Sequence, residues 1–340
     1  MTPSLFSDEV SGWLTYYEKC KNHKPSKEGL HITWSIMELV LCGKNWNFLL
    51  QNDDYNRLID IKFTFKVNNF VCDKNVPLLI ILVHTAPSHI VKRNLIRRTW
   101  GKTEQDIKIV FLLGTHSNVE IKDKLEQENL KHKDIVQGSF LDSYRNLTYK
   151  HVMGLKYVVY HCAQAKYVLK VDDDTCVNTP LLRKFLVRDL SPYGANNLLM
   201  GNVVRKAMAY RGFRSKWKVS FNEYRPRYYP IYCLGWYTLY SRDILFGLYK
   251  EAQQLQYFWL EDVFGTGFSA AKLNFSSHTD ISALTLSKNE FKLLKYCPIN
   301  RCRPFLFGWS DMDENEILDL WRYIMINPVP HSVKNETIES

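Results

Sequence analysis

The sequence lacks several features that identify common classes of protein. Its eight cysteines include no CxxC pair and no Cys/His spacing typical of zinc ligands, which argues against a zinc module. No RRM, KH or helix-turn-helix pattern accompanies the basic pI near 9.0, so we expect no nucleic acid as a partner. The most apolar window, residues 32–43, contains Glu38 and is too short and polar to span a bilayer, and its position fits no signal peptide.

The composition predicts a folded protein with a basic surface. Apolar residues make up 46% and aromatic residues 14% of the 340 residues, enough for a sizeable core, which excludes wholesale disorder. The formal net charge of +10 favours a phosphate-bearing or polyanionic partner.

Three consecutive carboxylates follow a short apolar run. Residues 167–171 have the pattern of a strand buried on both faces, and Asp172, Asp173 and Asp174 come directly after it. Adjacent like charges repel, and a divalent cation with hard oxygen ligands, Mn²⁺ or Mg²⁺, is a natural counter-charge. The alternative is a solvated turn in which one carboxylate caps the next helix. Ligands bind at the carboxyl ends of strands in open α/β sheets, and this placement favours the metal site.

Strands alternate with helices from Pro77 onwards. This order predicts an α/β fold with a parallel sheet that is covered on both faces and joined by right-handed crossovers. The expected strands are residues 78–83, 107–113, 134–137, 167–171 and 198–204, and the expected helices are residues 88–100, 119–132, 142–163 and 181–190. Residues 1–76 show no repeat or sustained period, so we expect a stem or extension there, a folded α/β domain over residues 77–325, and a polar tail over residues 326–340.

Two segments beyond the sheet strands stand out by composition. Residues 205–218 hold six Lys or Arg and no acid, which indicates either a basic loop near a diphosphate or acidic acceptor, or a solvated excursion. Residues 228–240 are dense in aromatics, which could pack on the flat faces of sugar rings or form a core strand.

Glu261 and Asp262 lie between hydrophobic residues at the expected start of a helix. The pair could cap that helix, stabilised by its dipole, or one of them could be a catalytic base.

The cysteines and glycosylation sequons leave the compartment open. Two or three disulfides could form in an oxidising compartment, with Cys297 and Cys302 as the closest pair, and buried free thiols are the alternative. Sequons at Asn146, Asn274 and Asn335 permit a secretory location.

Ordered sequence blocks between Pro77 and Tyr323 resemble the β-1,3-glycosyltransferase family, which includes β-1,3-galactosyltransferases, β-1,3-N-acetylglucosaminyltransferases and, more distantly, Fringe. A DxD motif alone is weak, but several blocks in the family's order make a specific match. The blocks are residues 93–101, 110–114, 140–148, 165–174, 229–235 and 261–264.

The resemblance implies a GT-A fold, Rossmann-like, with a mostly parallel sheet flanked by helices. It implies an inverting enzyme that moves galactose or an N-acetylhexosamine from a UDP-sugar to the 3-hydroxyl of a glycan acceptor on protein or lipid. It also implies Mn²⁺, with Mg²⁺ as the alternative, and a location on the lumenal face of the Golgi membrane. By their match to family positions, Asp262 is the catalytic base, Asp172 and Asp174 are metal ligands, and Arg93, Arg97, Asp172 and Asp173 lie on the donor side.

The sequence departs from the family pattern in two places. The membrane anchor that the family leads us to expect has no clear counterpart. A Val-His pair that completes metal ligation in many members is absent from residues 305–310. His278 or His331 could supply the missing histidine ligand instead. The second departure motivates an alternative function, a catalytically impaired member that binds a UDP-sugar or a partner enzyme.

Overall fold

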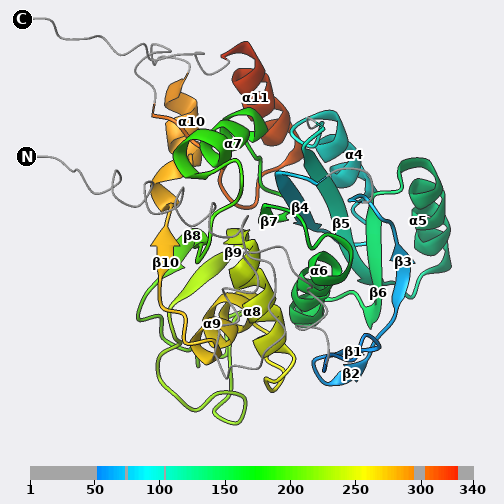
Figure 1. Cartoon of the computed structure of the whole chain (residues 1–340), viewed down its shortest axis with the longest axis vertical. Coiled ribbons are helices and arrows are strands. Elements are labelled where there is room, and N and C mark those ends of the chain that lie inside the picture. The colour runs from blue at the N-terminus through cyan, green and yellow to red at the C-terminus, as the bar shows by residue number, and fades with distance from the viewer. Residues whose placement is uncertain (1–51, 73–75, 103–104, 295–302, 328–340) are drawn as a thin grey trace, which may run out of the picture. The chain divides into compact units, whose positions relative to one another are not determined.

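Eight strands form one mixed sheet in the order β10-β8-β9-β7-β4-β5-β6-β3 (Figure 1). The computed structural model describes residues 52–72, 76–102, 105–294 and 303–327, and its structural unit begins at Asp53. The strands are β3 (Phe65–Asn68), β4 (Leu79–His84), β5 (Ile107–Thr115), β6 (Ile135–Leu141), β7 (Tyr167–Asp172), β8 (Leu199–Val204), β9 (Tyr232–Ser241) and β10 (His278–Asp280). A separate two-stranded sheet pairs β1 (Arg57–Leu58) with β2 (Ile61–Lys62).

The predicted α/β class with a mostly parallel sheet is confirmed. Strand β4 pairs in parallel with both β5 and β7, and β5 pairs in parallel with β6. Antiparallel pairing occurs where β9 joins β7 to β8 and where β3 joins β6. The aromatic segment 228–240 thus supplies an interior strand, and its Tyr237 and Tyr240 are fully buried.

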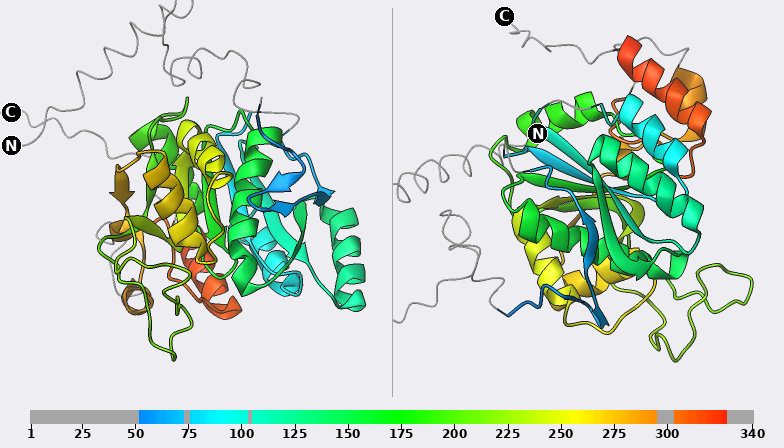
Figure 2. Two further views of the ribbon diagram at one scale, coloured as in Figure 1. Left: turned by 90° about the horizontal axis from the view of Figure 1, so that it is seen from below. Right: turned by 90° about the vertical axis from the view of Figure 1, so that its right-hand side faces the viewer.

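Helices cover both faces of the sheet (Figure 2). Alternate residues of β4 point to opposite faces: Ile81 joins the core cluster that contains Ile96 of α4 and Leu320 of α11, whereas Leu82 faces Gly154 of α6. Burial on both faces explains why the central strands read as continuous apolar runs. The helices are α4 (Ile90–Arg98), α5 (Val119–His132), α6 (Leu147–His161), α7 (Thr179–Phe185), α8 (Arg242–Ala252), α9 (Ser269–Lys272), α10 (Lys288–Leu294) and α11 (Glu314–Ile326).

The described part of the expected N-terminal extension belongs to the folded unit. Strand β3 pairs with β6 at one edge of the large sheet, and Cys72 forms a disulfide with Cys162 just after α6. The structural unit therefore begins at Asp53 and not at the expected boundary of residue 77. The sequence pattern misses this because β3 is a short, half-buried edge strand without a continuous apolar run.

Several expectations fall on other parts of the chain. The pair Cys297 and Cys302, His331 and almost all of the tail at residues 326–340 lie outside the described residues. Within the described ranges, Cys176 and Cys233 are buried free thiols. No helix in those ranges is both long and apolar enough to cross a membrane.

Candidate active site

The carboxyl end of β7 brings the acidic triplet to the sheet edge. The first five residues of β7 are buried, and Asp172, the sixth and last, is partly exposed. In the parallel pairing of β4 with β7, His84 lies opposite Asp172. The edge where β4 and β7 end together is therefore the place where ligands bind in sheets of this kind.

Lys170 joins Asp172 to Glu261. Its buried Nζ lies 2.7 Å from Asp172 Oδ1 and 2.8 Å from Glu261 Oε1, and it also donates a hydrogen bond to the carbonyl of Gly235. Burial works to lower the pKa of Lys170, but the charges of Asp172 and Glu261 outweigh it and raise that pKa. A buried ammonium between two carboxylates is fully satisfied, so Lys170 fixes the distance between β7 and the segment that carries Glu261.

Glu261 is a buried carboxylate that is ionised at physiological pH. Burial raises its pKa, but Lys170 and the His151 side chain, 3.5 Å away, bring the pKa down to about 2. His84 lies 3.9 Å from Glu261, and burial together with the Lys170 charge holds the pKa of His84 well below its usual range. His84 is therefore a neutral imidazole at physiological pH.

Asp262 follows Glu261 at the start of a helical segment. Its Oδ1 accepts a hydrogen bond from the backbone N–H of Val263 at 2.8 Å, and the chain continues as a π-helix over Val263–Phe268. Burial and the adjacent Glu261 charge raise the pKa of Asp262 to about 7. A half-buried carboxylate with this pKa can accept a proton near neutral pH.

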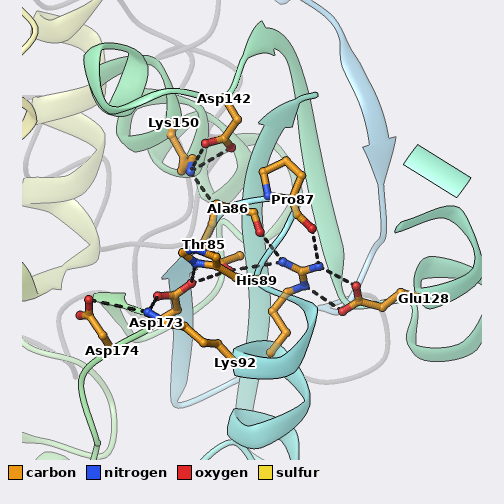
Figure 3. A network of polar contacts seen from close by, with 11 residues as sticks. Thr85, Ala86, Pro87, His89, Lys92, Glu128, Asp142, Lys150, Asp173 and Asp174 are labelled. Carbon is orange, nitrogen blue, oxygen red and sulfur yellow. Dashed lines mark hydrogen bonds and ion pairs between the residues drawn. The ribbon is translucent and has the colours of Figure 1, made fainter. Parts of the chain in front are cut away.

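Asp173 is engaged by the turn between β4 and α4 (Figure 3). Its Oδ2 accepts a hydrogen bond from Thr85 at 2.7 Å and lies 2.6 Å from His89 Nδ1, and its Oδ1 is bound by Lys92 at 3.1 Å. Burial acts to raise the pKa of Asp173, but the hydrogen bonds from His89 and Thr85 lower it below the usual range. Both oxygens thus have protein partners.

Asp174, unlike Asp173, is partly exposed to solvent. Its side chain is 28% exposed, and Lys92 lies 3.9 Å away. Burial raises the pKa of Asp174; Lys92 opposes this shift, whereas the charges of Asp173 and Asp311 add to it. The backbone N–H of Met312 donates to the carbonyl of Asp174 at 2.9 Å, so the segment after residue 310 lies against the triplet and places the Asp311 carboxylate near it.

Arg93 and Arg97 lie in a different network from Asp172. Arg93 is completely buried and binds Glu128, Thr85 and the carbonyls of Ala86 and Pro87, the partners labelled in Figure 3. Arg97 binds Glu128 at 2.7 Å and Asp134 at 2.8 Å. With their guanidinium groups paired in this way, both arginines hold α4 against neighbouring elements.

His278, one of the two expected substitutes for the missing metal-ligating histidine, does not belong to the group of possible metal ligands. Nε2 of His278, on β10, lies 2.7 Å from the carbonyl of Thr266, which is part of the π-helix after Asp262. Among the described residues, the group whose ligand atoms lie within 4.8 Å of one another consists of His84, Asp172 and Glu261.

The carboxylates at this edge suit a hard divalent cation. Burial and the neighbouring Glu261 and Asp174 charges raise the pKa of Asp172 to about 6, although Lys170 pulls it down. The raised pKa values of Asp172 and Asp174 show that the neighbouring lysines do not fully balance the negative charge of these carboxylates. A divalent cation would balance that charge, and carboxylate oxygens are ligands that Mg²⁺ and Mn²⁺ prefer. Glu261 fits this role less well because Lys170 and His151 together already bring its pKa down to about 2, whereas the pKa of Asp172 stays raised.

Sequence reasoning missed the parts of the site that connect its carboxylates. Lys170, His84 and His151 were not expected as site residues, yet each lies within 4 Å of Glu261. One signal was available, because a lysine in the middle of a strand buried on both faces requires a carboxylate partner. The sequence does not show that the partner of Lys170 is Glu261, because the two residues are far apart in the chain and meet only in the folded protein.

The family model for galactosyltransferases, described as "Galactosyltransferase", matches residues 91–280, more than half of the chain. The chain belongs to this family. Membership confirms the predicted enzyme class, a glycosyltransferase of the β-1,3-hexosyltransferase family, and the matched range contains the triplet, Lys170, Glu261 and Asp262.

Two curated relatives illustrate the family's range. The chain is 30% identical over 306 residues to the human UDP-GalNAc:beta-1,3-N-acetylgalactosaminyltransferase 1, with 88% of each chain covered. It is 35% identical over 253 residues to beta-1,3-galactosyltransferase 5 of Pan paniscus, with 71% of this chain and 83% of the relative covered. Among solved structures, the galactosyltransferase LgtC with donor and acceptor sugar analogues matches at 12% identity and a TM-score of 0.37, over 74% of this chain and 98% of that one.

Proposed function

We propose that this protein transfers galactose or an N-acetylhexosamine from a UDP-sugar to the 3-hydroxyl of an acceptor sugar on a glycoprotein or glycolipid, with inversion at the anomeric carbon. Two relatives carry names of β-1,3-linking enzymes, one for N-acetylgalactosamine and one for galactose, which supports this linkage and these donors. The observation that carries the proposal is the pairing of Asp262, with a pKa of about 7, with the ionised Glu261 that Lys170 ties to Asp172.

Asp262 is the proposed base. Its carboxylate takes the proton from the acceptor hydroxyl as that oxygen attacks the anomeric carbon from the face opposite UDP. A single displacement inverts the centre, so the mechanism needs no nucleophile from the protein. Glu261 assists by keeping the pKa of Asp262 high, which makes Asp262 a stronger base than an ordinary aspartate.

Asp172 and Asp174 are the proposed ligands of Mn²⁺, with Mg²⁺ as the alternative. When bound, such an ion supplies positive charge that stabilises the departing UDP. Lys170 orients Asp172 through their 2.7 Å contact. Asp173, Arg93 and Arg97 were expected on the donor side, and their contacts favour a positioning role, in which they hold the β4–α4 turn next to the triplet.

The proposed location is the lumenal side of the Golgi membrane. The disulfide between Cys72 and Cys162 supports an oxidising compartment, because such bonds are rare where cytosolic thiols are kept reduced.

The testing experiment measures UDP release by the full chain with Mn²⁺, a panel of UDP-sugars and β-linked sugar acceptors. We expect release that requires both metal and acceptor. Asp262→Asn removes the base and leaves the oxygen that caps Val263, so transfer should fall by a factor on the order of a thousand while UDP affinity stays nearly unchanged. Asp174→Ala should weaken both transfer and metal-dependent UDP binding. UDP binding without turnover by the unmodified chain would instead support the impaired, binding-only alternative.

A further inference from the structure

The connection between β8 and β9, residues 205–228, is the most basic part of the chain. We refer to it as the basic arm. It contains eight Lys or Arg residues and one acid, Glu223, whereas the whole protein has 45 basic and 35 acidic residues. The arm projects from the sheet (Figure 2), so its charge is displayed to solvent.

Internal hydrogen bonds give the basic arm a defined fold. Arg211 donates hydrogen bonds to the carbonyls of Val219, Ser220, Tyr224 and Pro226, at 2.7 to 3.0 Å. The backbone N–H of Ala209 donates to the carbonyl of Arg227 at 2.9 Å, which joins the two ends of the arm. The hydrogen bonds of Arg211 therefore stabilise the fold of the arm, and Arg205 donates a hydrogen bond to the carbonyl of His278. The six other cations of the arm are the candidates to bind a ligand.

The tip of the arm contacts the segment before α6. The Trp217 side chain forms a hydrogen bond with Tyr144, and Glu223 forms a 3.2 Å ion pair with Arg145. The guanidinium of Arg145 lies over the ring of Trp259, 4.1 Å from its centroid. Trp259 precedes Asp262 by three residues, so the arm is connected to the neighbourhood of the proposed base.

Electrostatics place Tyr144 near the same carboxylate. Burial raises the pKa of Tyr144, and the negative charges of Asp262, Glu261 and Asp172 add to the effect, against the hydrogen bond from Trp217. In addition, the indole N–H of Trp259 is buried without a hydrogen-bond partner among the described residues. An unpartnered buried donor, three residues before the base in the sequence, indicates a polar group that is supplied by a ligand.

The exposed cations of the arm are free of carboxylates. Within the described ranges, no ion pair engages Lys206, Arg214, Lys216, Lys218, Arg225 or Arg227. Exposed aromatic rings alternate with them: Phe213 is 81% and Trp217 43% exposed, and cations lie over both rings. Flat apolar rings interleaved with cations match a chain of sugar rings that carries anionic groups.

We propose that the basic arm recognises an anionic acceptor glycan, one that bears carboxylates or sulfates next to the sugar whose hydroxyl reaches Asp262. This inference rests on the proposed function and specifies its acceptor class. The arm's contacts lead to Tyr144 and Trp259, on the side of the base, where the acceptor must lie. The cations bind anionic groups on the sugars that follow the acceptor residue, while Trp217 and Tyr144 offer ring faces to those sugars.

The test compares binding of a chondroitin sulfate hexasaccharide with binding of the same hexasaccharide after desulfation and carboxyl reduction. Calorimetry on the full chain should show binding of the sulfated form that weakens as salt is added. Lys216→Glu with Lys218→Glu should lower its affinity on the order of tenfold or more. The matched control, Lys122→Glu with Lys131→Glu on α5, makes the same change in net charge at exposed positions and should retain wild-type affinity.

Each other outcome has a distinct meaning. Equal loss of affinity in both double variants, or equal binding of the neutral hexasaccharide, would overturn the inference. So would binding of phosphatidylserine-containing vesicles without binding of the hexasaccharide, because the arm would then be a membrane contact. UDP binding by the unmodified chain is measured in the same samples: its absence contradicts the proposed function, whereas its presence without hexasaccharide binding contradicts the inference alone.

Discussion

At the scale of single residues, the adjacent acids Glu261 and Asp262 have opposite properties. Contacts with Lys170 and His151 bring the pKa of Glu261 to about 2, and burial beside that charge raises the pKa of Asp262 to about 7. The sequence identified Asp262 as a possible base, but it could not show this division because Lys170 and His151 are distant in the chain and meet Glu261 only in the fold.

The pKa of Asp262 predicts the pH dependence of transfer. A base must be deprotonated, so kcat/KM should rise with pH, level off above about 7, and fall about tenfold per pH unit below it. Glu261→Gln removes the neighbouring negative charge, so the midpoint of this limb should move to lower pH. Initial rates across pH test both statements, and an unchanged midpoint in Glu261→Gln would show that Glu261 does not set the pKa of the base.

Lys170 is expected to matter for stability as well as activity. Lys170→Met would leave Glu261 buried without its closest cation, and removing one partner of a buried pair costs about 3–5 kcal/mol. Denaturant titration should therefore show a large loss of unfolding free energy. The same substitution at exposed Lys122 should change it by less than about 0.5 kcal/mol.

At the scale of elements, the central strands were predictable and the strand β9 was not. Leu79–His84 and Tyr167–Asp172 are continuous apolar runs because both faces of the sheet are covered, and such runs identify a strand by themselves. Strand β9 is rich in tyrosine, and rings such as Tyr237 and Tyr240 serve equally well in a core or at a sugar site. Only the antiparallel pairing of β9 with β7 and β8 shows that this segment is a core strand of the sheet.

The π-helix after Asp262 requires a glycine. A Cβ at Gly265 would lie 2.8 Å from His151 Nε2, closer than atoms can approach, so Gly265→Ala must displace His151 or the π-helix. We expect a loss of about 1–3 kcal/mol in stability and a reduced transfer rate, because His151 also contacts Glu261. Thermal unfolding and rate assays on Gly265→Ala should be compared with Gly212→Ala, where no atom lies within 4 Å of the added Cβ. Equal behaviour of the two variants would contradict this account.

At the scale of the whole molecule, residues before β4 are part of the fold. Asp53 accepts a hydrogen bond from Tyr160 of α6 at 2.7 Å and another from Gln253, just after α8, at 3.0 Å. These contacts join residues that are far apart in the chain. The boundary expected at residue 77 could not include them because polar anchors leave no periodic pattern in a sequence.

The disulfide should contribute strongly to stability. Cys72 and Cys162 are 90 residues apart, and closing a loop of that size in the unfolded chain corresponds to about 4.6 kcal/mol in the chain-entropy model. Cys72→Ser with Cys162→Ser should lower the midpoint of thermal unfolding by several degrees. Adding a reductant should lower the midpoint of the wild type and leave that of the double variant unchanged.

The same bond has a consequence for biosynthesis. A ribosome delivers Cys72 ninety residues before Cys162, and Cys20 and Cys42 have emerged by then. During that interval Cys72 either remains a thiol or pairs with an earlier cysteine, and a wrong partner must later be exchanged for Cys162. The edge strand β3 likewise cannot pair until β6 has been synthesised. Maturation of this enzyme should therefore depend on disulfide-exchange catalysts that act on the nascent chain, and a cell short of such catalysts should contain less of the folded enzyme.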